Sequence, residues 1–140
     1  MSAMTLSQLK AKWKTEQDSY RVREVGSGVQ KFVKDALACP DLFGLREGFM
    51  STAVEKRSKE FLEEQPNRGG LADVVIYVTP EVVVPVEIER FGNIAAGEGQ
   101  LLAYQLALDK RYGLLTDGWL WRFYNNNAYR EWTLWIAIWN

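Results

Sequence analysis

Three acidic residues near the middle of the chain have the types and spacing that metal-dependent chemistry requires. Asp73 falls in one run of β-forming residues, 71–78, and Glu87 and Glu89 fall in the next, 82–89. In a hairpin centred on Pro80, Asp73 and Glu87 face each other, because each lies seven residues from the turn. Side chains alternate along a strand, so Glu89 shares their face. We therefore expect three carboxylates to converge on one patch.

Like charges that face each other destabilise a sheet, and their removal from water beside valines adds a further cost. A divalent cation compensates both effects, and Mg²⁺, with Mn²⁺ as a substitute, binds one or two carboxylates together with waters and phosphate oxygens. We expect Asp73, Glu87 and Glu89 to hold the metal, with Glu89 alternatively orienting an attacking water. The structural alternative is that Glu87 and Glu89 are a salt-bridged pair whose counter-ions are Arg68, Arg90 or Arg111.

The composition excludes several other kinds of site. The chain has no histidine and a single cysteine, Cys39. Catalytic triads with an imidazole base, histidine-metal nucleases and thiolate zinc sites are therefore ruled out. We interpret Cys39 as a packing residue. Any enzymatic chemistry must use carboxylates, lysines, hydroxyls and a metal held by oxygen.

The net charge of −1 argues against binding of nucleic acid by bulk electrostatics. Residues 1–34 nevertheless carry seven basic and three acidic side chains, which predicts either a basic arm that contacts phosphates or a solvated helix face. The chain has no run of about 18 apolar residues and no secretion-signal pattern at its start. We therefore expect a soluble, cytoplasmic protein with no membrane partner.

Apolar periodicity predicts two helices, at residues 20–37 and 95–111. Gly26 and Gly28 weaken the middle of the first helix. A short strand is expected within 42–50, a second helix or charged helical arm at 52–64, and a loop at 65–70. The runs 71–78 and 82–89 have apolar residues on both faces, which is typical of strands buried in the centre of a sheet, although Pro85 is more common at an edge or a bulge.

The C-terminal part predicts further strands. Runs at 112–115 and 119–124 flank a Thr-Asp-Gly hairpin signal, three asparagines at 125–127 predict the next turn, and residues 129–139 form a last strand. The order of elements predicts an α/β sheet with helices on both faces, formed by a single domain that spans residues 1–140. Because the last strand stops in mid-pattern at Asn140, we expect the chain to be the N-terminal part of a longer protein.

Residues 70–77 (GLADVVIY) and 84–90 (VPVEIER) resemble the core of the PD-(D/E)xK nucleases. The resemblance is closest to the N-terminal nuclease domains of type I restriction subunits and of fused restriction–methylation enzymes. Residues 100–104 (QLLAY) match the Q-x-x-x-Y helix of that subgroup, and residues 112–124 resemble the strand pair that follows it. The resemblance implies a restriction-endonuclease-like core (αβββαβ) with a mixed central sheet, flanking helices and extra C-terminal strands.

The resemblance also assigns roles to individual residues. Asp73 and Glu87 are the implied metal ligands, and Gln100 and Tyr104 support the site or contact phosphate; their ordinary alternatives are a surface or capping glutamine and a core tyrosine. Tyr104 and Arg68 are the expected nucleic-acid contacts. An acidic residue on the first helix completes the site in this class, and Glu24 is the candidate, with Glu47 as the alternative. Glu89 departs from the pattern because the family usually has lysine there, and glutamate at that position calls for compensation by a second metal.

Three functions follow. The first is a Mg²⁺-dependent DNA endonuclease module of restriction type, which takes its DNA affinity from methyltransferase, motor or target-recognition domains of the parent chain and pairs transiently with a second copy on DNA. The second is a catalytically inactive domain of the same fold that binds nucleic acid or assembles subunits. The third is an interaction module that exposes its C-terminal tryptophans, namely Trp119, Trp121, Trp132, Trp135 and Trp139.

Overall fold

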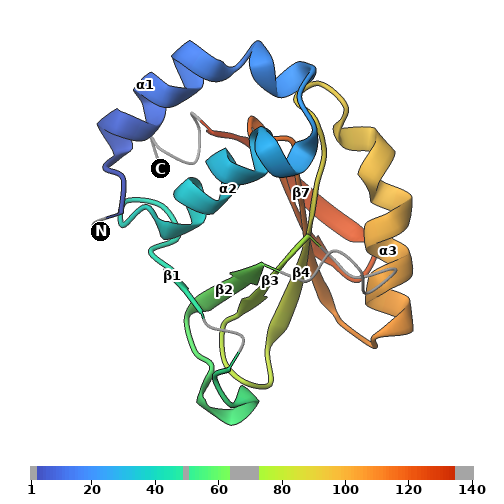
Figure 1. The fold of residues 1–140 in the computed structure, drawn as a ribbon. Helices are drawn as coiled ribbons and strands as arrows, with labels where there is room; N and C mark the ends of the chain where they lie inside the picture. The colour runs from blue at the N-terminus through green and yellow to red at the C-terminus, as the bar shows by residue number, and fades with distance from the viewer. Residues whose placement is uncertain (1–2, 49–50, 64–72, 135–140) are drawn as a thin grey trace.

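The protein is a mixed α/β structure, described by a computed structural model over residues 3–48, 51–63 and 73–134. Within these residues seven strands form one sheet, in the order in which they occur along the chain (Figure 1). Strands β1 and β2 are parallel, as are β4 and β5, and every other neighbouring pair is antiparallel. The strands are β1 (Arg46–Glu47), β2 (Glu60–Glu63), β3 (Val74–Tyr77), β4 (Val83–Ile88), β5 (Tyr112–Thr116), β6 (Leu120–Asn125) and β7 (Ala128–Thr133).

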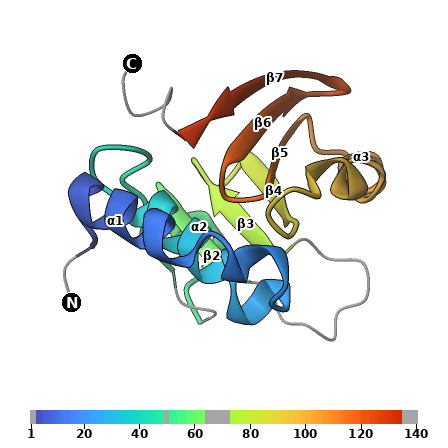
Figure 2. The ribbon, with the colours of Figure 1, turned by 90° about the horizontal axis from the view of Figure 1, so that it is seen from above.

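Helices cover both faces of the sheet (Figure 2). Helices α1 (Leu6–Glu16) and α2 (Val29–Ala38) lie on one face, and α3 (Glu98–Ala107) lies on the other. Short 3₁₀ turns occur at η1 (Ser19–Arg21), η2 (Val25–Ser27), η3 (Val54–Lys56) and η4 (Ile94–Gly97). None of the helices in the described part of the chain has the length and apolar character to cross a membrane.

The hydrophobic core has two parts, one on each face of the sheet. Under α1 and α2, the ring of Trp13 contacts Phe32 at 5.0 Å and stacks on Trp119 at 5.7 Å between ring centroids. Under α3, Leu101 packs on Leu115, and both side chains are fully buried. Burial on both faces makes β3, β4 and β5 the centre of the fold, as their apolar sequences predict.

The β3–β4 hairpin has the predicted register. Val74 pairs with Val86, and Tyr77 pairs with Val83. The hydroxyl oxygen of Thr79 accepts hydrogen bonds from the amides of Glu81 and Val82, which stabilises the turn. If this register is continued by one residue, from the Val74–Val86 pair, Asp73 lies opposite Glu87.

Pro85 is tolerated in this central strand because of where the second ladder begins. It pairs with Val75 of β3, whereas the pairing of β4 with β5 starts only at Val86. The proline therefore lies before the part of β4 that has partners on both sides, and its missing N–H interrupts no β4–β5 pair.

The predicted helix at 20–37 is wrong in its first half. Residues 20–28 instead contain the 3₁₀ turns η1 and η2, and only Val29–Ala38 is α-helical. Gly28 is the break: its backbone angles (φ −121°, ψ −107°) are not helical, and a Cβ there would lie 3.1 Å from Cβ of Arg23. Helix α1 was not predicted from the sequence, and a capping box between Thr5 and Gln8 fixes its start.

The helix expected at 52–64 is also wrong, because this segment contains η3 and strand β2. Its charged residues include a buried ion pair, with Arg57 and Glu60 3.0 Å apart, and β2 is held between β1 and β3. Tertiary pairing has overridden the local helical pattern.

The helix expected at 95–111 is confirmed over Glu98–Ala107, although Leu106 is 85 % exposed and gives no core contact. The predicted loop at 65–70 and the end of the last strand, 135–139, lie outside the described residues.

The predicted Asp-Gly hairpin between β5 and β6 is confirmed. Oδ1 of Asp117 accepts hydrogen bonds from the amides of Trp119 at 3.0 Å and Leu120 at 2.8 Å. Gly118 has a φ of +91°, and a Cβ there would lie 2.9 Å from side-chain atoms of both Trp13 and Val29. The turn therefore requires glycine for its conformation and for its close packing against the helical layer.

Gly118→Ala is expected to destabilise the fold by about 1–3 kcal/mol, the usual cost of a left-handed conformation at a non-glycine residue, with the overlap with Trp13 adding to it. Urea unfolding followed by tryptophan fluorescence measures the change. Gly26→Ala is the matched control, because nothing lies within 4 Å of its Cβ position and its φ is not positive. Equal stability of the two variants would contradict this account of the hairpin.

Candidate functional site

The face of the sheet that α3 covers carries the candidate carboxylates. Glu87 is the β4 partner of Leu115, which packs under α3. Asp73 enters the same face from the start of β3, and Glu89 follows two residues after Glu87 at the end of β4. The structure therefore brings the three predicted residues onto one side of two neighbouring strands.

Asp73 and Glu87 form the compact part of this cluster. The amide of Ile88 donates a hydrogen bond to Oδ2 of Asp73 at 2.9 Å, and the two carboxyl groups lie within hydrogen-bonding reach of each other. Glu87 is only 4 % exposed, and its Oε2 has no hydrogen-bond partner among the described residues. A buried acceptor without a donor is costly, so this oxygen fits a position that a cation would complete.

Burial is the main cause of the raised pKa values in the cluster. It raises the pKa of Glu87 to about 8, and the negative charges of Asp73 and Glu89 act in the same direction. Burial also raises the pKa of Asp73, against the opposing effect of the Ile88 amide, and it raises the pKa of Glu89 together with the charge of Asp73. At neutral pH the folded protein therefore keeps a proton on Glu87, which a bound cation would have to displace.

Glu89 is the outer member of the cluster. Its backbone amide donates to the carbonyl oxygen of Thr116 at 2.9 Å, which ties the end of β4 to the end of β5. Within residues 3–48, 51–63 and 73–134, no group of three His, Cys, Asp or Glu side chains is close enough to hold a metal ion. The cluster is therefore best described as two adjacent carboxyl groups, Asp73 and Glu87, with a third carboxylate beside them.

Gln100 and Tyr104, the two α3 residues predicted from the Q-x-x-x-Y match, lie in different surroundings. Tyr104 is 5 % exposed and packs on Val75 of β3, next to the strand position of Asp73. Gln100 is exposed on α3. The buried glutamine of this helix is Gln105, whose Nε2 donates to the carbonyl oxygens of Arg111 and Asn126 at 3.1 Å. Tyr104 thus faces the sheet near the site, and Gln100 faces solvent.

The acidic residues proposed to complete the site lie on irregular or edge elements. Glu24 precedes η2, its side chain is 88 % exposed, and its ion-pair partner is Arg90 at 3.8 Å. Glu47 lies on β1 and pairs with Lys34 at 3.0 Å. Arg68 lies outside the described residues. Neither Glu24 nor Glu47 shows a contact with Asp73 or Glu87 in the described structure.

Glu63 is a residue that the sequence did not single out. It pairs with Val74 in the β2–β3 register, and its negative charge contributes to the raised pKa of Asp73. Its carboxylate accepts hydrogen bonds at 2.8 Å from Gln30 and from Lys34, both on α2. The charge-rich pattern of residues 52–64 predicts a helical arm, and a helical arm would place Glu63 on no strand.

The described structure offers no cationic partner for Glu87 and Glu89, the two acidic residues at the end of β4. Arg90 pairs with Glu24, and Nε of Arg111 donates to the side chain of Asn125. Neither Glu87 nor Glu89 forms an ion pair within the described ranges. Arg90 and Arg111 therefore do not act as counter-ions of a salt-bridged Glu87–Glu89 pair, and Arg68, the third candidate counter-ion, lies outside the described residues.

The basic side chains of the N-terminal region are partly used inside the molecule. Lys12 pairs with Asp35 at 2.6 Å, and Lys34 pairs with Glu47 and Glu63. These bridges join α1, α2 and the edge of the sheet. They leave less free positive charge for a phosphate than the composition of residues 1–34 suggests.

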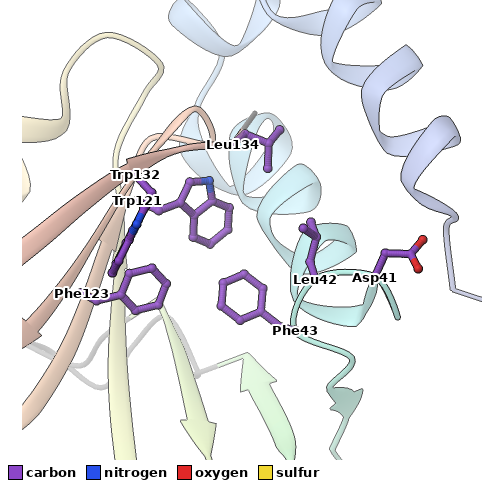
Figure 3. A pocket seen from close by; sticks show the side chains of 7 residues that line it. All are labelled: Asp41, Leu42, Phe43, Trp121, Phe123, Trp132 and Leu134. Carbon is purple, nitrogen blue, oxygen red and sulfur yellow. The ribbon is translucent and has the colours of Figure 1, made fainter. Parts of the chain in front are cut away.

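The C-terminal tryptophans in the described residues belong to the core or to its margin. Trp121 is 2 % exposed, and Trp119 packs against the core around Trp13. Trp132 borders an apolar pocket of about 580 Å³ on the α2 face, where aromatic rings from β6 and β7 surround a hollow beside the segment after α2 (Figure 3). Among the described residues that line it, Asp41 is the only acidic one, so they do not form a cluster of carboxyl groups like that of Asp73 and Glu87. Trp135 and Trp139 lie outside the described residues.

Comparisons with protein-family models, curated proteins and solved structures find no match. The geometry of the site therefore carries the functional argument.

Wild-type stability is expected to fall as the pH rises between about 4.5 and about 8, because the folded protein retains the Glu87 proton that the unfolded chain releases. Glu87→Gln, which cannot ionise, should remove this part of the pH dependence and be relatively more stable at the alkaline end. Urea unfolding at several pH values measures both proteins. Glu81→Gln, at the exposed hairpin tip, is the control. Parallel pH profiles for wild type and Glu87→Gln would contradict the buried, protonated state.

Proposed function

We propose that the protein is a Mg²⁺-dependent endonuclease domain that hydrolyses phosphodiester bonds in DNA, of the kind found in restriction and modification enzymes. The observation that carries the proposal is the Asp73–Glu87 pair, in which Glu87 is buried and its Oε2 has no donor in the described structure. Two carboxylates with a free oxygen match the ligand set of Mg²⁺, which keeps waters and substrate phosphate oxygens as its other ligands.

The order of elements around the pair supports the proposal. Helix α2 is followed by the two-residue strand β1, then by the antiparallel strands β2, β3 and β4, and then by α3 and strand β5, which is parallel to β4. Apart from β1, this order is compatible with the αβββαβ core implied by the resemblance to PD-(D/E)xK nucleases, with β6 and β7 as additional strands. Fold alone does not specify activity, so the order supports the proposal and the carboxylates carry it.

Each residue has a defined part in the proposed reaction. Asp73, oriented by the Ile88 amide, and Glu87, after loss of its proton, hold the cation. A bound Mg²⁺ supplies polarisation of the scissile phosphate and a lowered pKa for a coordinated water. Glu89, beside the pair, accepts a hydrogen bond from the attacking water and so orients it. Tyr104 and Gln100 of α3 are then the residues proposed to support the site or to contact the phosphate backbone.

The net charge of the chain affects how strongly it attracts DNA. With a net charge of −1 and an acidic site, the domain attracts DNA weakly by itself. We propose that methyltransferase, motor or target-recognition parts of a longer chain supply the remaining contacts, and that two copies pair transiently to cut both strands.

Cleavage of supercoiled plasmid DNA in the presence of Mg²⁺ or Mn²⁺ tests the proposed function, best in the full parent chain. Asp73→Asn and Glu87→Gln keep the shape of the side chain and remove its charge. Each is expected to lower both Mn²⁺ affinity and cleavage by more than the roughly 10–100-fold that loss of an outer-shell partner costs. Calorimetric titration with Mn²⁺ and a gel-based cleavage assay measure the two effects.

Glu81→Gln serves as the matched control for this experiment, because Glu81 is an exposed acid of the same hairpin. It should bind Mn²⁺ and cleave DNA as the wild type does. Full activity of Asp73→Asn and Glu87→Gln, with folding preserved, would refute the assignment.

A second candidate function rests on Glu89, which replaces the lysine usual in the resembling family. Under this alternative the domain keeps the fold without catalysis and binds nucleic acid or assembles subunits. The wild type would then bind no Mn²⁺ and cleave no DNA, yet it would retain measurable binding to DNA or to a partner subunit. The same titration separates the two functions.

A further inference from the structure

Gly97, the residue before α3, touches the outer carboxylate of the site. It is buried, and a Cβ at this position would lie 2.7 Å from Oε1 and 2.9 Å from Cγ of Glu89. It would also lie 2.7 Å from Cδ1 of Leu115. Contacts this short do not occur for real Cβ atoms, so the side chain of Glu89 occupies space that only glycine leaves open.

Glycine is needed at residue 97 because a side chain would not fit there, and the backbone conformation does not require it. Gly97 has φ −90° and ψ −11°, a conformation that alanine adopts without strain. Gly99, two residues later, has nothing within 4 Å of its Cβ position. Of these two glycines at the start of α3, only Gly97 has Glu89 and Leu115 packed against its Cβ position.

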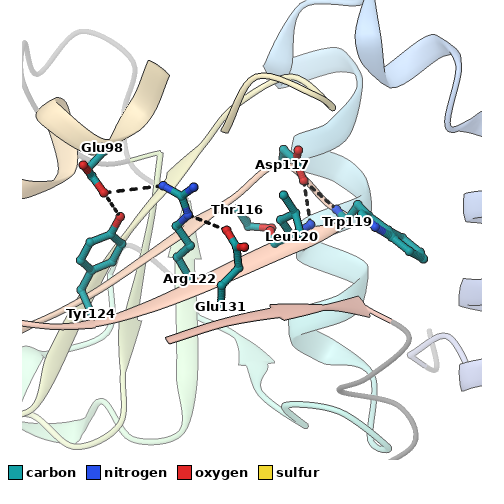
Figure 4. Close-up of polar contacts among 8 residues, drawn as sticks. All are labelled: Glu98, Thr116, Asp117, Trp119, Leu120, Arg122, Tyr124 and Glu131. Atoms are coloured by element: carbon teal, nitrogen blue, oxygen red, sulfur yellow. Dashed lines mark hydrogen bonds and ion pairs between the residues drawn. The ribbon is translucent and has the colours of Figure 1, made fainter. Parts of the chain in front are cut away.

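Polar contacts hold the first turn of α3 against the sheet next to Gly97. The hydroxyl of Tyr124 donates to Oε2 of Glu98 at 2.6 Å, and Arg122 forms an ion pair with the same oxygen at 3.6 Å (Figure 4). Nε of Arg122 in turn donates to Glu131 at 2.7 Å. These contacts hold α3 in place against the sheet. A side chain added at residue 97 would therefore displace the flexible side chains next to it, and the helix would stay where it is.

The backbone around Glu89 is also fixed. The Glu89 amide is bound to the carbonyl oxygen of Thr116, and the amide of Gly92 donates to Oδ2 of Asp117 at 3.0 Å. A Cβ at residue 97 would therefore move the Glu89 carboxylate, whose side chain can change rotamer, while the strand that carries it stays in place.

We propose that Gly97 is a positioning residue that sets where the Glu89 carboxylate lies beside the Asp73–Glu87 pair. The proposal rests on the proposed function for its catalytic meaning, because the position of Glu89 affects water and cation at that site. Gly97 acts only through Glu89, and the packing contact with Leu115 is a separate effect.

The first measurement is the affinity for Mn²⁺ alone, by calorimetry, in wild type, Gly97→Ala and the control Gly99→Ala. Gly97→Ala is expected to weaken Mn²⁺ binding by about 10–100-fold, as loss of an outer-shell contact does, and Gly99→Ala should match the wild type. In a Glu89→Ala background, Gly97→Ala should cause no further loss. A further loss there would assign the effect to Leu115 and overturn the proposal.

The second measurement needs no metal. In protein labelled with ¹³C at the glutamate carboxyls, Glu89→Gln identifies the Glu89 resonance. Gly97→Ala should shift this resonance in the metal-free protein, and Gly99→Ala should leave it in place. If Gly97→Ala fails to fold, the double variant Gly97→Ala/Leu115→Val is used, because valine lacks the Cδ1 atom and leaves Glu89 as the remaining short contact.

The two measurements separate the two proposals. A wild type that binds no Mn²⁺, with the Glu89 resonance shifted by Gly97→Ala alone, would refute the metal site and support the positioning role. An unshifted resonance in a folded Gly97→Ala variant would overturn the positioning role, whatever the affinity for Mn²⁺.

Discussion

The pairing of β4 with β3 on one side and β5 on the other is the constraint on which the rest of the structure depends. It aligns Glu87 with Leu115, which packs under α3, and alternation along the strand sends Ile88 to the other face, under α1 and α2. A slip by one residue would exchange the two sets, placing carboxylates in the core under α1 and α2 and Ile88 on the α3 face. The carboxylate cluster and the two-sided core are thus specified by the same hydrogen bonds.

This placement has an electrostatic consequence that packing alone cannot relieve. Glu87 is buried beside two other acidic side chains, and the described structure provides no cationic side chain for it. A proton on Glu87 relieves the repulsion at neutral pH, and a divalent cation would relieve it further by using the unpartnered oxygen. An apolar residue of similar size would avoid the cost of burying a carboxyl group at this position, which is the physical reason for proposing a chemical role for Glu87.

The sequence predicted the features that depend on neighbours along the chain. The register of the β3–β4 hairpin followed from its turn, and the Asp117–Gly118 turn followed from its dipeptide. Features that depend on distant residues were missed. Strand β2 forms because β1 and β3 flank a charged segment whose Arg57–Glu60 pair is buried, and Gly97 is constrained by Glu89 and Leu115, which approach it only in the folded sheet. No local pattern contains that information.

The replacement of lysine by Glu89 changes how such a site must work. A lysine would bring a positive charge to the phosphate from the protein itself, whereas Glu89 adds a negative charge that the solvent or a cation must offset. Of the lysines of α1 and α2, Lys12 and Lys34 do not compensate, because they are bound to Asp35, Glu47 and Glu63 within the fold. Under the proposed function, phosphate would approach this face together with bound cations, and dependence on divalent metal would be a stricter requirement here than in a site that contains lysine.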